Sequence, residues 1–252
     1  MIKINIKRKN FENLLVLEDI NLEIEKSEFF CILGPSGCGK STLLRCIGGF
    51  EEFEGEVYLD GEKVQKPRKD SIMVFQDFQQ LFPWLSVLDN VLFAMKHING
   101  ERKDNHKKAL DFLKLVGLKD FANYYPHQLS GGMKQRVAIA RSLATKPKVL
   151  LMDEPFGSLD AQTRAILQRE LLKLWKQFKT TIVFVTHNIQ ESIILGDRIM
   201  VMSQNPGKIK LLAKNDLPRP RRPDKEGFAE FWHYLYSNLG RKKLEEEIAS
   251  NV

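Results

Sequence analysis

The chain has 252 residues and a formal net charge of +7, and 43% of its residues are hydrophobic while 28% are charged. This balance predicts a folded chain with a sizeable core and excludes a largely disordered one. No apolar run approaches the roughly 18 residues that a membrane-spanning helix needs, and the alternating charged and apolar residues at the start argue against a signal peptide. We therefore expect a protein that remains in the cytoplasm.

The first predicted elements are antiparallel strands. Apolar and polar residues alternate from Ile2 to Ile6, as in a half-buried strand. Further on, the dipeptide Asp60-Gly61 follows two alternating apolar residues and predicts a tight hairpin turn. Three later runs are apolar almost throughout, as in strands covered on both faces: Phe29–Leu33, Val149–Met152 and Thr181–Val185.

Helical patterns separate these runs. A single apolar stripe from Leu167 to Phe178 predicts one helix. Residues 81–144 show no strand pattern and predict a helical insertion, in which one helix ends at Val116 with Gly117 as its left-handed cap. The alternation of buried strands and helices predicts an α/β fold.

A glycine-rich segment follows the first buried run and precedes a helical pattern. It reads Gly34-Pro35-Ser36-Gly37-Cys38-Gly39-Lys40-Ser41-Thr42 and matches the G-x-x-x-x-G-K-[ST] pattern of a phosphate loop. Glycines let main-chain N–H groups curl around a phosphate, Lys40 adds a full positive charge, and Ser41 can bind Mg²⁺.

Cys38 lies inside this loop at the start of a helix, where the helix dipole and Lys40 favour a thiolate. We expect alkylation of Cys38 to block nucleotide binding. The chain has only two other cysteines, Cys31 and Cys46, and no C-x-x-C pair, which argues against a disulfide framework and against a structural zinc site.

Two further segments carry chemistry. Asp153 and Glu154 follow the second buried run, so we expect one carboxylate near Mg²⁺ and the other as the base that activates water. Ser130, Gly131 and Gly132 precede a helical pattern, where Ser130 can cap the helix and free N–H groups can bind an anion. A second anion site suggests a nucleotide held by another copy of the chain.

Together these segments resemble the ATPase subunit of ATP-binding-cassette (ABC) transporters over about residues 1–213. The resemblance also gives roles to Gln76 as the Q-loop glutamine, to His187 as the switch histidine and to Phe11 as the aromatic that stacks on adenine. The remaining motifs correspond to Walker A (Gly34–Thr42), the signature motif (Leu129–Gln135), Walker B (Asp153 and Glu154) and the D-loop (Ser158–Asp160). Phe11, Met133 and Asn188 depart mildly from the commoner tyrosine, glutamine and aspartate.

The resemblance implies a P-loop NTPase (RecA-like) core with an N-terminal antiparallel β subdomain and an inserted α-helical subdomain. Within one domain of residues 1–252, the core and β subdomain would take 1–80 and 145–215, the helical subdomain 81–144, and a basic tail and helix 216–252. It implies ATP and Mg²⁺ as cofactors. The implied catalytic residues are Glu154, His187 and Gln76. The implied metal ligands are Ser41, Gln76 and Asp153. The implied ATP contacts are Phe11, Gly34 to Thr42, Ser130, Gly131, Gly132 and Asp160.

The resemblance further implies a head-to-tail homodimer bound to integral membrane permease subunits, at the cytoplasmic face of the inner membrane. An extracytoplasmic solute-binding protein would act indirectly, and no nucleic acid is expected. The segments Phe82–Val91 and Leu217–Arg222 are similar to those of importers for nitrate, sulfonates and taurine. Vitamin-precursor import, lipoprotein release, cofactor assembly and a nucleic-acid-associated ATP switch remain alternatives.

Two segments of the chain predict features of the surface. The apolar residues Phe78, Phe82 and Trp84 follow Gln76 closely and predict a surface that receives a short permease helix. The basic, proline-broken stretch Lys208–Lys225 lacks interleaved aromatics and predicts a solvated, extended tail.

Overall fold

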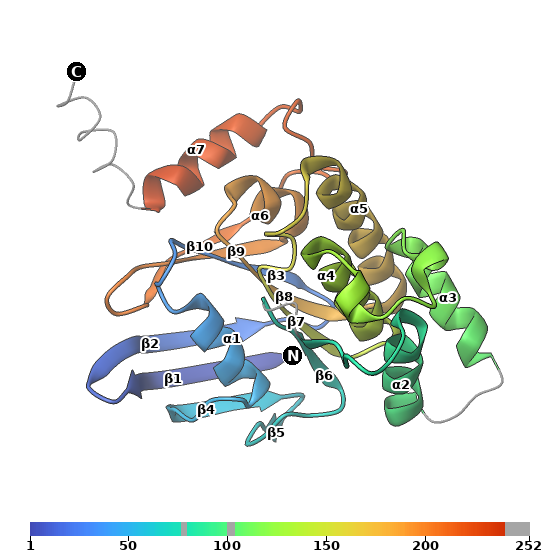
Figure 1. Ribbon diagram of the computed structural model, residues 1–252. Helices are drawn as coiled ribbons and strands as arrows, with labels where there is room; N and C mark the ends of the chain where they lie inside the picture. The colour runs from blue at the N-terminus through green and yellow to red at the C-terminus, as the bar shows by residue number, and fades with distance from the viewer. Residues whose placement is uncertain (77–79, 100–103, 240–252) are drawn as a thin grey trace, which may run out of the picture. The chain divides into compact units, whose positions relative to one another are not determined.

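The computed structural model describes residues 1–76, 80–99 and 104–239 (Figure 1). The chain forms two compact units. The first combines Met1–Pro67 with the chain from Val183 onward, and the second is Arg68–Ile182. These units begin and end at other residues than the segments expected above, so the division of the chain by function stays a prediction.

The first unit contains a four-stranded antiparallel sheet in the order β2-β1-β4-β5. Ile2, Ile4 and Ile6 are buried while their neighbours face solvent, which confirms the alternation expected for the first strand. The turn at Asp60-Gly61 joins β4 to β5 with positive φ angles at both residues, as predicted. The strands span Ile2–Phe11 (β1), Leu14–Ile24 (β2), Glu54–Leu59 (β4) and Glu62–Lys63 (β5).

The first unit also contains strands in the order β10-β9-β3-β8. β3 (Phe29–Leu33) is buried at every residue and pairs in parallel with β9 (Arg198–Met202), which pairs antiparallel with β10 (Ile209–Lys214). β8 (Thr181–Thr186) carries the chain from the second unit into the first. The helices of this unit are α1 (Lys40–Gly48), α6 (Ile189–Leu195) and α7 (Phe228–Asn238).

The second unit is mainly helical. Its strands β6 (Ser71–Val74) and β7 (Val149–Asp153) pair in parallel. Gly117 has a φ of 68° just after α3, which confirms the left-handed turn expected there. The helices are α2 (Val87–Asn99), α3 (Asn105–Leu115), α4 (Gly131–Ala144) and α5 (Ala161–Phe178), with 3-10 turns at Lys119–Phe121 and Pro126–Gln128.

These observations confirm the α/β fold class. The N-terminal sheet is antiparallel, buried strands pair in parallel, and the described residues between 81 and 144 are helical or irregular. On α5 the expected apolar stripe is buried at Leu167, Leu171 and Leu174. Among the described residues, none of the helices combines the length and the apolar composition that a membrane span requires.

The basic stretch before α7 is not the solvated tail that was expected. Arg221 donates hydrogen bonds to the main-chain oxygens of Ile193, Gly196, Asn215 and Leu217, and only 8% of it is exposed. Burial lowers the pKa of its guanidinium to about 10. The last carbonyls of a helix have no acceptor role within the helix and attract cationic donors, which explains why this arginine turns toward the end of α6.

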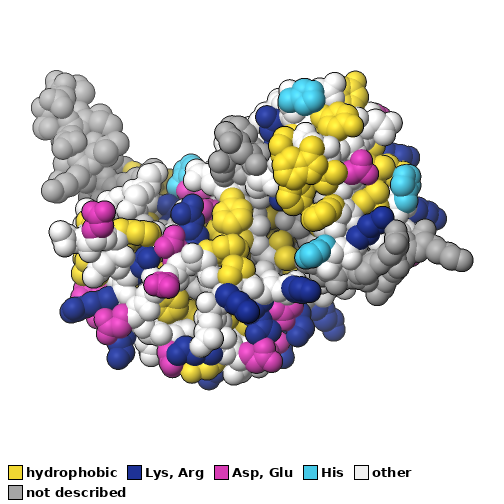
Figure 2. Space-filling view, turned by 60° about the horizontal axis from the view of Figure 1, so that its bottom comes forward, with side chains coloured by type: hydrophobic (Ala, Val, Ile, Leu, Met, Phe, Trp, Pro, Cys, Tyr) yellow, Lys and Arg dark blue, Asp and Glu magenta, His cyan; other side chains and the backbone are white. Residues whose placement is uncertain are grey.

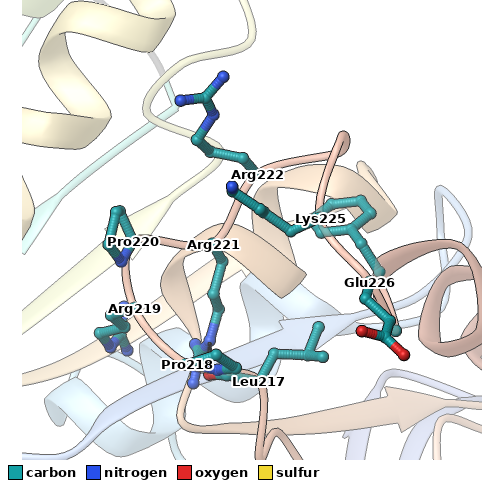
Figure 3. Close-up of a pocket in the computed structure, with 10 residues that line it drawn as sticks. Leu217, Pro218, Arg219, Pro220, Arg221, Arg222, Lys225 and Glu226 are labelled. Atoms are coloured by element: carbon teal, nitrogen blue, oxygen red, sulfur yellow. Dashed lines mark hydrogen bonds between the residues drawn. The ribbon is translucent and has the colours of Figure 1, made fainter.

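Arg219 behaves in the same way. It donates to the oxygens of Ile194 and Leu195 and pairs with Asp197 at 2.7 Å. Figure 3 shows that Arg222, by contrast, points away from Arg221, beside a cavity of about 680 Å³. That cavity is lined by Leu217–Arg222 and Lys225–Phe228. The end of the predicted tail, residues 240–252, lies outside the described residues.

Candidate functional site

The glycine-rich segment forms the loop between β3 and α1 in the first unit. Lys40, at the start of α1, donates hydrogen bonds of 2.9 Å from Nζ to the main-chain oxygens of Gly34 and Pro35. Only 5% of Lys40 is exposed. The ammonium group is therefore held against the loop that surrounds it, where it can supply charge to a bound phosphate.

Positive φ angles at Gly37 (78°) and Gly39 (95°) let this loop curl. Gly39 is also the residue just before α1, and a Cβ there would lie 2.8 Å from Cδ2 of Leu17 on β2. A larger residue at Gly39 is strained by this backbone angle and would also have to displace the end of the Leu17 side chain. Successive N–H groups in such a curled loop form a concave anion site.

Cys38 does not fit the expectation of a reactive thiol. Its side chain is 1% exposed, and a Cβ on Gly34 would lie 2.7 Å from its sulfur. The thiol thus packs inside the loop and away from solvent, so the expectation that Cys38 is open to alkylation is wrong. The sequence pattern placed Cys38 in the loop but did not reveal which way its side chain points.

Two further predicted residues lie in the first unit. His187 is exposed and follows β8 directly. The turn after it is fixed by Asn188, whose Oδ1 accepts the N–H of Glu191 at 3.2 Å and thereby caps α6. Asn188, which departs from the commoner aspartate, keeps the capping oxygen and loses only the charge.

Phe11 ends β1, and 44% of it is exposed. The Nζ atom of Lys9 lies 4.2 Å from the centre of the Phe11 ring and is also 3.0 Å from Glu51. A buried cation thus supports the ring, which is a geometry compatible with stacking on an aromatic base.

In the second unit, Asp153 is the last residue of β7 and is 2% exposed. Glu154 follows with a φ of 44°, and its main-chain oxygen accepts the N–H of Gly157 at 3.1 Å. A left-handed conformation at a residue other than glycine costs roughly 1–3 kcal/mol, and such residues are concentrated at functional sites. The chain therefore turns sharply at Glu154, directly after Asp153, and the surrounding turn must stabilise this conformation.

Gln76 is exposed and comes two residues after β6. The residue before it, Phe75, exchanges main-chain hydrogen bonds with the side chain of Gln80 at 3.3 and 3.1 Å. The main-chain carbonyl of Phe75 also accepts a hydrogen bond of 3.3 Å from Nε2 of Gln135, which lies on α4. Gln135 is the last residue of the expected signature motif, but its residue type gives no sign of this hydrogen bond, because the acceptor is a main-chain carbonyl 60 positions away.

Ser130 caps α4, as predicted: its Oγ accepts the N–H of Met133 at 3.3 Å. A Cβ on Gly132 would lie 3.2 Å from Cδ2 of Leu159 and 3.5 Å from the oxygen of Ser158, so this glycine lies against the Ser158–Asp160 segment. The structure thus brings two of the predicted motifs together within the second unit.

Asp160 caps α5 by accepting the N–H of Thr163 at 2.9 Å. This main-chain hydrogen bond holds the pKa of Asp160 below its usual range. Asp160 is therefore a carboxylate at neutral pH. Its capping role is visible in the structure, whereas its contact with nucleotide stays a prediction.

The predicted residues are divided between the two units. Phe11, the phosphate loop and His187 belong to the first. The second holds Gln76, Ser130, Gly131, Gly132, Asp153, Glu154 and Asp160. The three predicted Mg²⁺ ligands offer a hydroxyl, an amide and a carboxylate oxygen, and such hard oxygen donors fit Mg²⁺.

Comparison with known proteins agrees with these motifs. Residues 17–157 match the family model described as "ABC transporter". The chain is 49% identical over 223 residues to the aliphatic sulfonates import ATP-binding protein SsuB of Bacillus cereus (strain ATCC 10987 / NRS 248), covering 88% of this chain and 87% of that protein. It is 45% identical over 207 residues to the taurine import ATP-binding protein TauB of Rhizobium johnstonii, covering 82% and 78%.

A solved structure is similar as well. The dimeric post-hydrolysis state of the ATP-binding cassette MJ0796 bound to ADP and Pi has a TM-score of 0.75 and 36% identity, and the match covers 86% of this chain and all of that one. This similarity supports a P-loop NTPase cassette, the fold implied by the phosphate loop between β3 and α1. The chain belongs to the ABC transporter family and is an ATP-binding ATPase of that family.

Proposed function

We propose that this chain is the ATP-hydrolysing subunit of an importer that takes up a small anion or zwitterion, such as a sulfonate, taurine or nitrate. The observation that carries the proposal is the order of motifs around Lys40 and Glu154, together with family membership. Relatives named for sulfonate and taurine import support the solute class.

In the proposed reaction, the loop around Lys40 binds the phosphates of ATP through its N–H groups and the ammonium charge. Ser41, Gln76 and Asp153 would hold Mg²⁺, which neutralises charge on the phosphate oxygens. Glu154 orients and deprotonates the attacking water, and His187 donates a hydrogen bond to the γ-phosphate. Phe11 stacks on adenine, backed by Lys9.

The signature segment would act on a second copy of the chain. Gly131 and Gly132 open α4 with N–H groups that have no partner within a helix, and Ser130 adds a hydroxyl. These donors suit the γ-phosphate of a nucleotide bound by the other copy. ATP then stabilises a head-to-tail homodimer, and hydrolysis removes the group that joins the two copies.

The proposed permease contact is an aromatic surface in the second unit. Phe82 lies 5.5 Å from Trp84 and 4.9 Å from Phe93 between ring centres, and Arg141 lies 5.5 Å above the Phe82 ring. Trp84 is 71% exposed. Phe78, expected in the same surface, lies outside the described residues.

Burying such grouped, exposed aromatic side chains against a short partner helix is more favourable than leaving them in water. Figure 2 shows hydrophobic side chains gathered beside histidines on one part of the visible face, whereas Lys, Arg, Asp and Glu mix on another part. Binding to permease subunits would place the chain peripherally at the cytoplasmic face of the inner membrane, with the solute-binding protein acting only through the permease. Nucleic acid has no part in this proposal.

The decisive experiment replaces Glu154 with Gln, which keeps the shape of the side chain and removes the base. We expect Glu154→Gln to bind ATP normally, to hydrolyse it at least a hundredfold more slowly, and to form a stable dimer with ATP and Mg²⁺. Glu62→Gln, an equivalent change on β5, serves as the control and should behave like the natural chain. Near-normal turnover in Glu154→Gln, or a chain that stays monomeric with ATP, would contradict the assignment.

The solute is tested separately by uptake in cells that lack this gene. Loss of sulfonate, taurine or nitrate accumulation supports the proposed solute class. Unchanged uptake of all three, with loss of vitamin-precursor uptake, would overturn it and leave the ATPase assignment intact.

A further inference from the structure

The turn that joins β9 to β10, residues 203–208, lies against the phosphate loop although the two are far apart in the sequence. Nε2 of Gln204 donates a 2.8 Å hydrogen bond to the main-chain oxygen of Ser36. The turn itself is closed by Ser203, whose Oγ donates to the oxygen of Pro206 and accepts the N–H of Lys208, both at 3.1 Å. Both segments belong to the first unit.

Gly207 makes a second contact with the loop. A Cβ at this position would lie 2.3 Å from the main-chain oxygen of Cys38, so only glycine can approach so closely. Gly207 is held there by β2: its N–H donates to Val16 at 2.8 Å, and its oxygen accepts the N–H of Glu18 at 3.1 Å. A salt bridge of 2.7 Å between Lys208 and Glu18 joins the same two segments.

These contacts determine which way the loop N–H groups face. In a planar trans peptide, the carbonyl and the N–H point in opposite directions. The carbonyl of Ser36 faces Gln204, and the carbonyl of Cys38 faces Gly207. The N–H groups of the same two peptides belong to Gly37 and Gly39, and they must therefore point away from the turn.

We propose that Gln204 and Gly207 are positioning residues for nucleotide binding: by holding two carbonyls on the outer side of the phosphate loop, they aim the N–H groups of Gly37 and Gly39 at the phosphates. This rests on the proposed function, because it takes the loop as the phosphate site. Both residues would act through their contacts with the loop. The turn sets the phosphate affinity through the loop, as a preorganised donor set costs less to order on binding.

The test is nucleotide affinity, measured by titration calorimetry with ATP-Mg²⁺ and with ADP-Mg²⁺. Gln204 is exposed, so Gln204→Ala should leave the melting temperature unchanged. We expect Gln204→Ala to lower the affinity for ATP and for ADP by the same factor. That factor should be about threefold to tenfold, which corresponds to the loss of one neutral hydrogen bond. A glutamate cannot donate a hydrogen bond to Ser36, so Gln204→Glu should lose at least as much affinity as Gln204→Ala. An arginine can donate this hydrogen bond, so Gln204→Arg should keep the natural affinity.

Two controls separate this inference from the proposed function. Gln65→Ala removes an exposed glutamine of the first unit that lies after β5, and it should bind both nucleotides like the natural chain. Lys40→Ala should abolish binding. If Lys40→Ala binds normally, the proposed function and this inference both fail; if Lys40→Ala fails to bind while Gln204→Ala and Gln204→Glu bind normally, only the inference fails.

Gly207→Ala adds a second measurement. Its methyl group must displace the Cys38 carbonyl, so the folded variant should bind nucleotide more weakly than Gln204→Ala does. A folded Gly207→Ala with natural affinity would overturn the role of that contact.

Discussion

Gln135 on α4 donates a hydrogen bond of 3.3 Å to the main-chain oxygen of Phe75, the residue that precedes Gln76. The two residues are 60 positions apart. Since α4 begins directly after Ser130, the helix that carries the proposed dimer contact also holds the start of the segment proposed to bind Mg²⁺. A shift of α4 would therefore displace Phe75 and, with it, the adjacent Gln76.

Replacing Gln135 with Met removes this hydrogen bond and tests whether it affects ATP turnover without affecting the stability of the fold. Phe75 keeps its hydrogen bond from Gln80, and Oε1 of Gln135 is buried without a hydrogen-bond partner in the described part of the chain. Stability should therefore change by less than about 1 kcal/mol. We expect ATP turnover to fall while the melting temperature stays close to natural. Gln65→Met is the control, and unchanged turnover in Gln135→Met would show that the contact does not position Gln76.

Ser130 can be tested by separating its capping role from its proposed phosphate contact. Ser130→Ala should lose about 0.5–2 kcal/mol of stability, because the Met133 N–H loses its acceptor. Ser130→Asp restores the cap but places a negative charge where the γ-phosphate of the other copy is expected. In the Glu154→Gln background, gel filtration with ATP-Mg²⁺ should show no dimer for either Ser130 variant. A normal dimer for Ser130→Asp would contradict the proposed phosphate contact.

The three cysteines should resist alkylation in the folded chain. Cys31, Cys38 and Cys46 are thiols outside any disulfide, and all three are buried. Burial raises the pKa of the Cys31 thiol and raises that of Cys46 to about 12, so both remain neutral thiols near pH 7. Iodoacetamide should label none of them in minutes but all three in denaturant. Rapid labelling of Cys38 in the folded chain, prevented by ATP, would show that the loop opens.

The same pKa shift predicts a pH dependence of stability. An unfolded thiol with a pKa near 9.0 ionises above that pH, whereas Cys46 in the folded chain does not ionise until pH 12. The free energy of unfolding should therefore decrease as the pH rises above 9. Denaturant titrations at pH 8, 9 and 10 should show a smaller decrease in Cys46→Ala than in the natural chain, and equal decreases would contradict the shift.

Trp84 provides the test of the permease contact. Because 71% of it is exposed, Trp84→Ala should change stability by less than about 0.5 kcal/mol and leave the ATPase activity of the isolated chain intact. We expect loss of co-purification with the permease subunits and loss of uptake in cells. Tyr234→Ala on α7, another exposed aromatic, is the control. Normal coupling in both Trp84→Ala and Phe82→Ala would exclude this surface as the docking site.

Local features of this chain could be predicted from its sequence because their causes are local. The alternation at Ile2–Ile6 and the buried run at Phe29–Leu33 follow from which faces of a strand are covered. The phosphate loop is equally local: its glycines and Lys40 lie within seven consecutive residues, so the loop can be recognised from their spacing. The Ser130 cap follows from a serine that precedes a helix by one residue.

Only the tertiary structure decided the contacts between distant segments. Gln204 reaches Ser36 across 168 positions, Gln135 reaches Phe75, and Arg219 and Arg221 turn toward α6 in place of solvent. Each of these side chains has an ordinary surface pattern in its own segment. Apart from the ion pair of Arg219 with Asp197, their partners are main-chain carbonyls, which every residue carries, so residue types cannot single out the acceptor. The path of the backbone places one carbonyl within reach of the donor and leaves the others out of reach.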